Sequence, residues 1–266
     1  MFDAIQPPAV STPPPGGKLR GREGLLARHR WLTFLVPLAV YMLAGSLEPK
    51  PQPASGAGWL PIPYHYYPVV YTLKLALTLG AVLWVLPGYR GFSFRVSPLA
   101  VLVGVVGIVV WVGLCALRLE QRWLVPLGLG RFVDLGTRSG YNPFAGLNPE
   151  DAHWARIILA VRFFGLVLVV PVIEEFFLRG FLMRFFVRGD WWDVPIGTVN
   201  WAALLVGLAY PVLSHPAEAF AAAAWFSLVT LLMIKTRNLW DCVVAHAVTN
   251  LLLGLYVVRW EQWHLM

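Results

Sequence analysis

Charged residues are scarce in this chain. Asp, Glu, Lys and Arg make up 13% of its 266 residues, while 58% of the residues are hydrophobic. Soluble domains carry about 25% charged residues, so the composition excludes an ordinary soluble domain and indicates an integral membrane protein. The formal net charge is +7, but no basic cluster is interleaved with an aromatic platform. The positive charge therefore suits contact with the lipid bilayer, and no nucleic acid is expected as a partner.

Cysteine is also scarce, and internal repeats are missing. Cys115 and Cys242 both lie in apolar segments, and neither belongs to a CxxC pair. We interpret them as small hydrophobic side chains rather than as a disulfide or metal ligands. With no repeat and no second domain visible, we expect one integral membrane domain over residues 31–266. A disordered, Pro-rich and basic tail is expected at residues 1–30.

Long apolar runs dominate the rest of the chain. They predict an all-α fold, namely a polytopic transmembrane helical bundle with about seven spans and a range of six to eight. In the third run, Gly104, Gly107 and Gly113 would permit close contact between helices. The predicted spans cover residues 31–47, 68–86, 98–117, 156–186, 196–213, 218–234 and 239–258.

Lys and Arg are unevenly distributed between the two sides of these spans. The N-terminal side has eleven: Lys18, Arg20, Arg22, Arg28, Arg30, Arg90, Arg95, Arg184, Arg188, Lys235 and Arg237. The opposite side has seven: Lys50, Arg118, Arg122, Arg131, Arg138, Arg156 and Arg259. Because cytoplasmic loops carry the excess of Lys and Arg, this bias predicts a cytoplasmic N terminus and, with seven spans, an external C terminus.

The fourth span contains two adjacent glutamates inside an apolar run. On a helix, Glu175 and Arg179 stand in the favourable i, i+4 order for an ion pair. Glu174 lies about 100° further round the helix and is left to titrate. A charge at bilayer depth costs a few kcal/mol, which favours a functional site; the alternative is a water-exposed helix end with a surface salt bridge. Pro171 should kink the helix nearby and release a backbone carbonyl for water or substrate.

Two further polar sites lie on later spans. His215 ends the fifth span, and His246 and Asn250 share one face of the seventh. Each could be only a polar packing residue. Together with the glutamates they favour catalysis, because a carboxylate in an apolar pocket binds a proton more tightly and can act as a general base. Imidazole and carboxamide donors can stabilise the oxyanion of an attacked peptide carbonyl.

Three motifs thus occur in order on successive spans: EExxxR, a single histidine and HxxxN. They comprise Glu174, Glu175, Arg179, His215, His246 and Asn250. This arrangement resembles the CAAX protease and bacteriocin-processing (CPBP) family of intramembrane endopeptidases, over roughly residues 155–258, which would be the catalytic core. The family usually carries phenylalanine four residues before its first histidine, where this chain has Pro211 beside Tyr210. The N-terminal half of the chain, with its loop DLGTRSGYNPF at residues 134–144, further resembles the bacterial subgroup associated with exosortase protein-sorting systems.

The resemblance implies an endopeptidase acting on a membrane-associated protein or peptide. Glu174 with His215 would activate water, His246 and Asn250 would hold the oxyanion, and the second glutamate with its arginine would brace the site. A bacterial cytoplasmic (inner) membrane location and an exosortase-type sorting system as partner are implied as well. Two other classes stay open, a proton-coupled transporter and a non-catalytic membrane scaffold or immunity factor. A transporter would more often show repeated halves.

The role of metal is also open. Members of the family are commonly labelled metalloproteases, although a metal-free mechanism based on glutamate has been argued as well. A zinc ion would take Glu174, His215 and His246 as ligands, but the sequence lacks HExxH. Since Arg179 would repel a dication, we favour a site with no bound metal and no cofactor, with zinc as the alternative.

The span drawing raises one difficulty. His215 ends the fifth span at one side of the membrane, whereas the seventh span, which carries His246, begins at the opposite side. These residues can meet only if the fifth to seventh segments are short, tilted or partly sunk below the surface.

Overall fold

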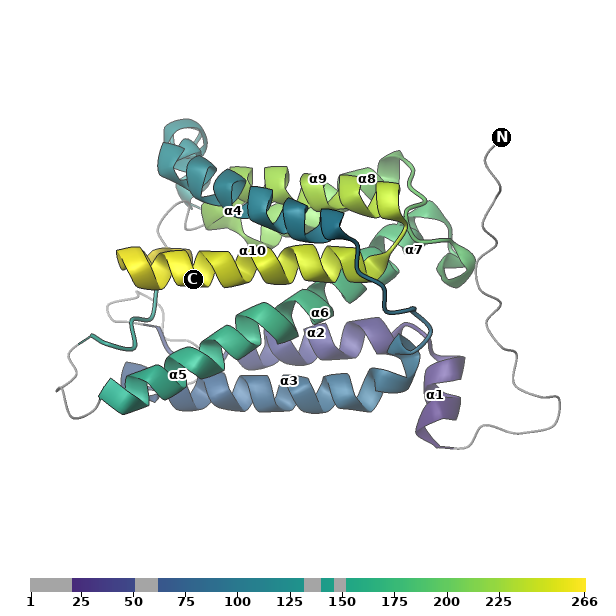
Figure 1. The fold of residues 1–266 in the computed structure, drawn as a ribbon, viewed down its shortest axis with the longest axis horizontal. Helices are drawn as coiled ribbons and strands as arrows, with labels where there is room; N and C mark the ends of the chain where they lie inside the picture. Colours follow the sequence, from purple (N-terminus) through teal and green to yellow (C-terminus); the bar gives the residue numbers. More distant parts are fainter. Residues whose placement is uncertain (1–20, 51–61, 132–139, 146–151) are drawn as a thin grey trace.

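The computed structural model describes residues 21–50, 62–131, 140–145 and 152–266, and every regular element within these ranges is a helix (Figure 1). Five helical segments are long and apolar enough to cross a membrane, and two shorter ones are apolar. The predicted polytopic helical membrane bundle is therefore confirmed. The five long segments are Tyr64–Tyr89, Pro98–Leu117, Ala152–Val187, Pro216–Thr236 and Leu239–Trp260, and the shorter ones are Leu32–Gly45 and Trp201–Ser214.

The individual helices follow the chain in a simple order. The α-helices are α1 (Arg22–Arg28), α2 (Leu32–Gly45), α3 (Tyr67–Tyr89), α4 (Pro98–Leu117), α5 (Ala152–Phe164), α6 (Val170–Glu175), α7 (Met183–Val187), α8 (Trp201–Ser214), α9 (Ala219–Thr236) and α10 (Leu239–Trp260). Turns of π-helix are η2 (Glu120–Leu124), η5 (Gly165–Val169) and η6 (Phe176–Leu182). Short 3₁₀ turns are η1 (Tyr64–Tyr66), η3 (Leu129–Arg131), η7 (Trp191–Asp193), η8 (Pro216–Glu218) and η9 (Trp263–Leu265).

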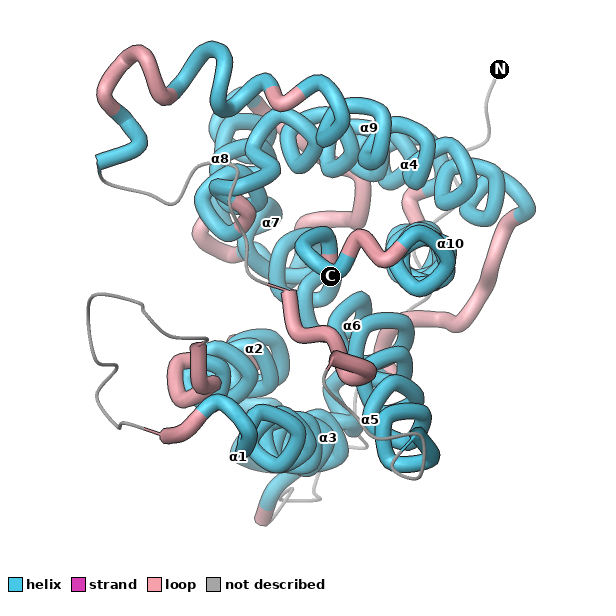
Figure 2. The backbone as a smooth tube through the Cα atoms, turned by 90° about the vertical axis from the view of Figure 1, so that its left-hand side faces the viewer, coloured by secondary structure: helices cyan, strands magenta, loops and turns pink. Residues whose placement is uncertain are grey.

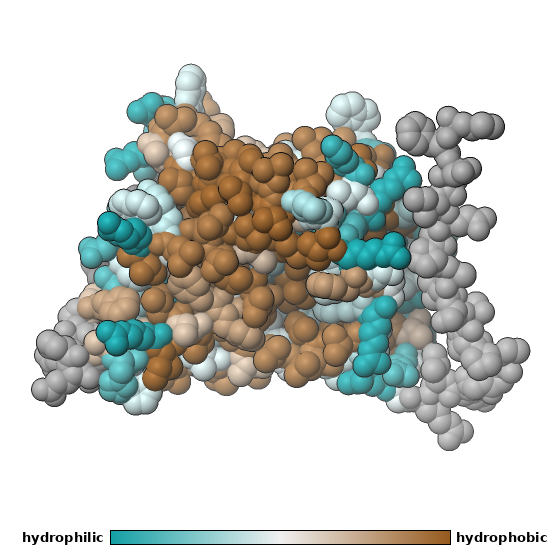
Figure 3. Space-filling view, viewed as in Figure 1, coloured by the Kyte–Doolittle hydropathy of each residue, from teal (hydrophilic) through white to brown (hydrophobic). Residues whose placement is uncertain are grey.

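The helices run roughly antiparallel and form two groups. In Figure 2, α2, α3 and α5 lie on one side and α4, α8 and α9 on the other, with α6 and α10 between them. The end of the bundle that holds α1 lies opposite the end at which α10 finishes (Figure 1). Hydrophobic side chains cover the middle of the molecule and hydrophilic ones gather at both ends (Figure 3). The bundle axis therefore corresponds to the membrane normal.

One predicted boundary differs from the structure. Residues 22–28, assigned to the disordered tail, form helix α1 instead. The reason is local packing, because Leu26 is buried in an apolar cluster with Phe34, Val85 and Tyr89. The rest of that tail, residues 1–20, lies outside the described residues.

Two of the three predicted contact glycines lie at close helix crossings. A Cβ atom on Gly104 would come within 2.8 Å of the Ala245 carbonyl oxygen in α10, and one on Gly107 within 2.4 Å of Nε1 of Trp225 in α9. A Cβ atom on Gly113 would meet nothing within 4 Å. Gly104 and Gly107 therefore allow α4 to pack directly on the helices that carry the candidate site.

The predicted disturbance at Pro171 takes the form of a π-helical turn. The backbone N–H of Val170 bonds to the carbonyl of Gly165, five residues earlier. In the same register the carbonyl of Leu166 would need the N–H of residue 171, which proline does not have. Pro171 thus releases one carbonyl, as expected from the sequence, while the helix continues into α6 (Figure 1).

Candidate active site

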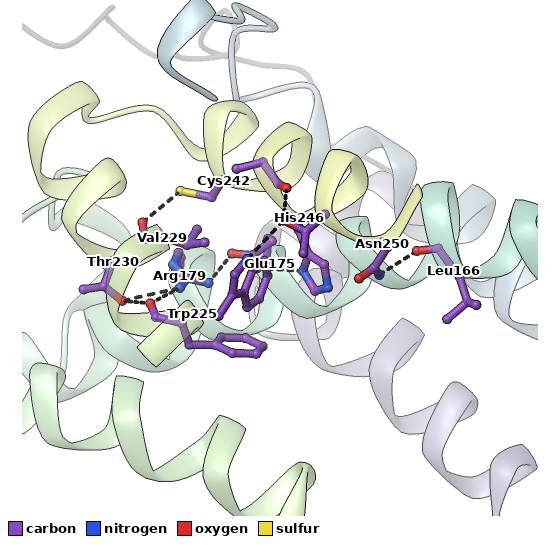
Figure 4. Close-up of polar contacts among 12 residues, drawn as sticks. Leu166, Glu175, Arg179, Trp225, Val229, Thr230, Cys242, His246 and Asn250 are labelled. Atoms are coloured by element: carbon purple, nitrogen blue, oxygen red, sulfur yellow. Dashed lines mark hydrogen bonds and ion pairs between the residues drawn. The ribbon is translucent and has the colours of Figure 1, made fainter. Parts of the chain in front are cut away.

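The centre of the site is a buried ion pair within the long helix. Glu175 ends α6 and Arg179 lies one turn later in η6, and both side chains are 0% exposed. The guanidinium Nη1 of Arg179 donates to Oε2 of Glu175 (Figure 4). The predicted i, i+4 pair is therefore present, and a water-exposed surface salt bridge is excluded. Buried charges of this kind persist only with good hydrogen-bond partners.

Arg179 also joins the pair to α9. Its Nη2 donates to the carbonyl of Phe226 at 2.9 Å and reaches the hydroxyl of Thr230 at 3.4 Å. The guanidinium lies over the Phe226 ring, 5.6 Å from its centroid. These contacts hold Arg179 against the centre of α9.

His246 satisfies the second oxygen of Glu175. Its Nδ1 lies 2.9 Å from Oε1 of Glu175 (Figure 4). A carboxylate accepts here, so Nδ1 carries the hydrogen of this bond and Nε2 is the nitrogen that remains for a ligand. The His246 ring meets Trp225 edge-on at 4.6 Å between centroids. Both oxygens of Glu175 are thus engaged by protein donors.

Glu174 points to a different environment. It is half-buried and lines a cavity of about 490 Å³. His215, His246 and Asn250 line the same cavity, together with Tyr210. The six predicted site residues therefore fall into a cavity-lining set and a buried pair, Glu175 and Arg179, directly behind it.

The short length of α8 explains how His215 reaches the others. This helix has 14 residues, which is about 21 Å, whereas the hydrocarbon core of a bilayer is about 30 Å thick. A helix of this length is too short to cross that thickness along the bundle axis, and His215 follows its last residue. Its ring packs against Trp111 and Phe226, at 5.8 and 5.9 Å between centroids. This segment is therefore short, which is one of the conditions under which His215 and His246 can meet.

Pro211 orients the His215 ring. Nδ1 of His215 lies 3.1 Å from the Pro211 carbonyl oxygen and 3.0 Å from the Ser214 hydroxyl. A carbonyl can only accept, so this contact places the hydrogen on Nδ1 and the lone pair on Nε2. A histidine in that tautomer can accept a proton at Nε2.

Asn250 is bound to the carbonyl that Pro171 releases. Its Nδ2 donates to the Leu166 oxygen at 2.8 Å (Figure 4). A carboxamide nitrogen carries two hydrogens, so one further donor of Asn250 can serve the cavity. The π-helical turn, the proline and the asparagine therefore act as one local unit.

Several cavity residues carried no clear signal in the sequence. Tyr210, Trp225 and Phe226 line the cavity, but aromatic residues in an apolar span look like ordinary core. A lysine within an apolar span can extend towards a lipid headgroup, but Lys74 is 5% exposed, forms an ion pair with Glu48 and lies 4.1 Å from the centroid of the Tyr41 ring. Spacing along one segment cannot reveal such partners from another.

The arrangement does not provide a zinc site. Within the described ranges, no group of three or more His, Cys, Asp or Glu side chains is placed to hold a metal ion. Nδ1 of His246 is engaged by Glu175, and Arg179 adds a positive charge directly behind that carboxylate. Glu174, His215 and His246 therefore do not fit together as a ligand set here.

These features define a helical membrane protein with a buried Glu–Arg–His centre beside a cavity. Residues 156–252 match the family model described as Type II CAAX prenyl endopeptidase Rce1-like. The match covers well under half of the chain but includes all six predicted site residues. No curated protein and no solved structure matches the chain. The family resemblance drawn from the three motifs is supported, and this match carries no information on the exosortase-associated subgroup.

Proposed function

We propose that this protein is an intramembrane endopeptidase that cleaves a peptide bond in a membrane-associated protein or peptide. One observation carries the proposal: both oxygens of Glu175 are engaged by Arg179 and His246, while the neighbouring Glu174 lines a cavity with His215. The two adjacent glutamates therefore have different environments. The match of residues 156–252 to a CAAX endopeptidase model supports the same reaction class.

In the proposed reaction, Glu174 acts as general base with the assistance of His215. The carboxylate of Glu174 removes a proton from water, and the hydroxide attacks the peptide carbonyl carbon. Nε2 of His215, whose lone pair is set by the Pro211 contact, accepts a hydrogen bond from that water. The proton then passes to the departing amine as the carbon–nitrogen bond breaks, so atoms and charges balance.

The oxyanion formed in this step needs hydrogen-bond donors. Asn250 has a second Nδ2 hydrogen besides the one given to Leu166. Nε2 of His246 can donate when the ring carries both protons. Donors placed where negative charge develops are worth about 2.7–4 kcal/mol each. Glu175 and Arg179 hold the His246 ring and the α9 backbone in place and make no contact with substrate in this proposal.

The location is also a proposal. The eleven-to-seven count of Lys and Arg flanking the spans predicted from the sequence supports a cytoplasmic N terminus, and the bacterial inner membrane is the membrane implied by the resemblance. The exosortase-associated subgroup and its sorting system rest on the N-terminal half of the chain and its loop at residues 134–144. Most of that loop lies outside the described residues, so that assignment stays a prediction from sequence alone.

The proposed function is tested by co-expression with candidate membrane proteins. The wild type and a Glu174→Gln variant are produced at equal levels, and new protein termini in the membrane fraction are compared by mass spectrometry. We expect a set of new termini that depends on Glu174. Identical termini in both samples would contradict the proposed activity.

A further inference from the structure

Beyond α10 the chain turns back towards the cavity. Glu261 follows the helix with a φ of 56°, in the left-handed region, which redirects the backbone. The short turn η9 comes next, and Leu265 and Met266 line the cavity. Figure 2 views the bundle from the end at which α10 finishes and shows this part of the chain running from α10 towards the middle of the bundle. We call residues 261–266 the return segment.

Trp263 anchors the return segment. It is 9% exposed, and its ring lies 6.2 Å from the ring of Phe144 between centroids. The backbone of Gly140 comes so close that an added Cβ atom would lie 1.7 Å from the Trp263 carbonyl oxygen. Only glycine permits this approach, so the return segment is packed directly on the loop at residues 140–145.

Arg162 of α5 holds the tip of the return segment. Its side chain is buried, and its Nη2 donates to the carbonyl oxygen of Met266 at 3.2 Å. Its Nη1 donates to the carbonyl oxygen of Tyr141 at 2.6 Å. The guanidinium also lies beside the rings of Tyr67 and Tyr71, at 5.9 and 6.0 Å from their centroids. One buried cation therefore ties both the tip and the loop beneath it to α5.

The bonds within the return segment are local. The N–H of Leu265 donates to the carbonyl of Gln262 at 3.0 Å, and that of Met266 to the carbonyl of Trp263 at 3.3 Å. Both tip residues are half-buried. The tip can therefore leave the cavity without unwinding α10, as short segments with few buried contacts open at low free energy.

We infer that the return segment is a movable cap on the end of the cavity and that Arg162 holds this cap closed. With the cap closed, Leu265 and Met266 block the approach to His246 and Asn250 along α10. Release of the tip from Arg162 opens the cavity to water and polar ligands from this end of the bundle. The inference goes beyond the proposed function and holds for any reaction in the cavity.

The cap is tested by the labelling of a cysteine inside the cavity. Leu253 lines the cavity one turn after Asn250 on α10, and Leu253→Cys is introduced together with Cys115→Ala. A charged, water-soluble thiol reagent is added to the detergent-purified protein, and labelling is followed by mass spectrometry. Leu265→Ala/Met266→Ala should raise the labelling rate about tenfold, because the rate follows the population of the open form. His264→Ala, at an exposed position of the same segment, is the control and should leave the rate unchanged. Equal rates in all three proteins overturn the inference.

The role of Arg162 is tested with the same reporter. Arg162→Gln removes the cation, and Gly140→Ala displaces the return segment through Trp263 without removing a charge. Both variants should speed the labelling of Leu253→Cys, while Cys242, which is 0% exposed, stays unlabelled and so reports an intact fold. Labelling as slow as in the parent protein in both variants overturns the hold of Arg162 on the cap.

Discussion

Nδ1 of His246 lies 2.9 Å from Oε1 of Glu175, which joins α10 to the long helix at a fully buried residue. Together with the Arg179 contact, this bond engages both oxygens of Glu175. The neighbouring Glu174 faces the cavity instead. Two adjacent and chemically identical residues therefore have separate roles, one in positioning and one in the proposed chemistry.

Glu174→Gln should abolish proteolysis without unfolding the protein. The substitution keeps the shape of the side chain and removes the base, and general-base catalysis contributes about 10²–10⁴-fold in rate. Cleavage of a reporter substrate and the thermal unfolding of detergent-purified protein are measured together. Wild-type turnover in this variant would show that Glu174 is not the base.

Glu175→Gln should lower both stability and activity. Removing one partner of a buried ion pair costs about 3–5 kcal/mol, because the other charge is left uncompensated. The double variant Glu175→Gln/Arg179→Met removes both charges and should recover part of the lost stability without recovering activity. Thermal unfolding of the two variants and the wild type is compared. Equal stability of the single variant and the wild type would contradict the buried pair.

Asn250→Ala should destabilise the protein by about 1–3 kcal/mol, because the Leu166 carbonyl loses its donor. Adding Pro171→Ala supplies a backbone N–H at the position where the π-helical register needs one. The double variant should therefore regain stability but not activity, since Asn250 is also a proposed oxyanion donor. Unfolding and cleavage are measured for both. No recovery of stability on adding Pro171→Ala would argue against the link between proline and asparagine.

Gly104→Ala should destabilise the bundle by about 1–3 kcal/mol, the usual effect of overpacking. The new methyl group would lie 2.8 Å from the Ala245 backbone oxygen and would push α4 away from α10. Gly113→Ala, on the same helix with open space around it, is the control and should be neutral or slightly stabilising. Thermal unfolding of the two variants tests this, and equal shifts would contradict the close crossing.

Chelators should leave the activity unchanged. The cavity residues do not form a ligand set for zinc, so we expect active, detergent-purified protein to contain no stoichiometric metal. Elemental analysis and assays with and without a strong chelator provide the measurement. Activity lost to the chelator and restored by zinc would make His215 and His246 ligands and would replace the proposed mechanism.

The apolar runs and the rare charges within them were sufficient to predict the helical membrane bundle and the Glu175–Arg179 pair. Both are local properties: hydrophobic length decides whether a segment can span a bilayer, and an i, i+4 pair is set by helix geometry alone. The sequence also indicated His215, His246 and Asn250 as candidates, because polar groups are costly in an apolar span.

Only the tertiary structure determined which of these residues line the cavity and which form the buried pair behind it. Three contacts join separate segments of the chain. They are the hydrogen bond between His246 and Glu175, the hydrogen bond from Asn250 to the Leu166 carbonyl, and the contact of Lys74 with the Tyr41 ring. Such contacts depend on how the helices pack. Periodicity within one segment determines which face of a helix a residue occupies, but the partner on that face is determined by the packing of another helix.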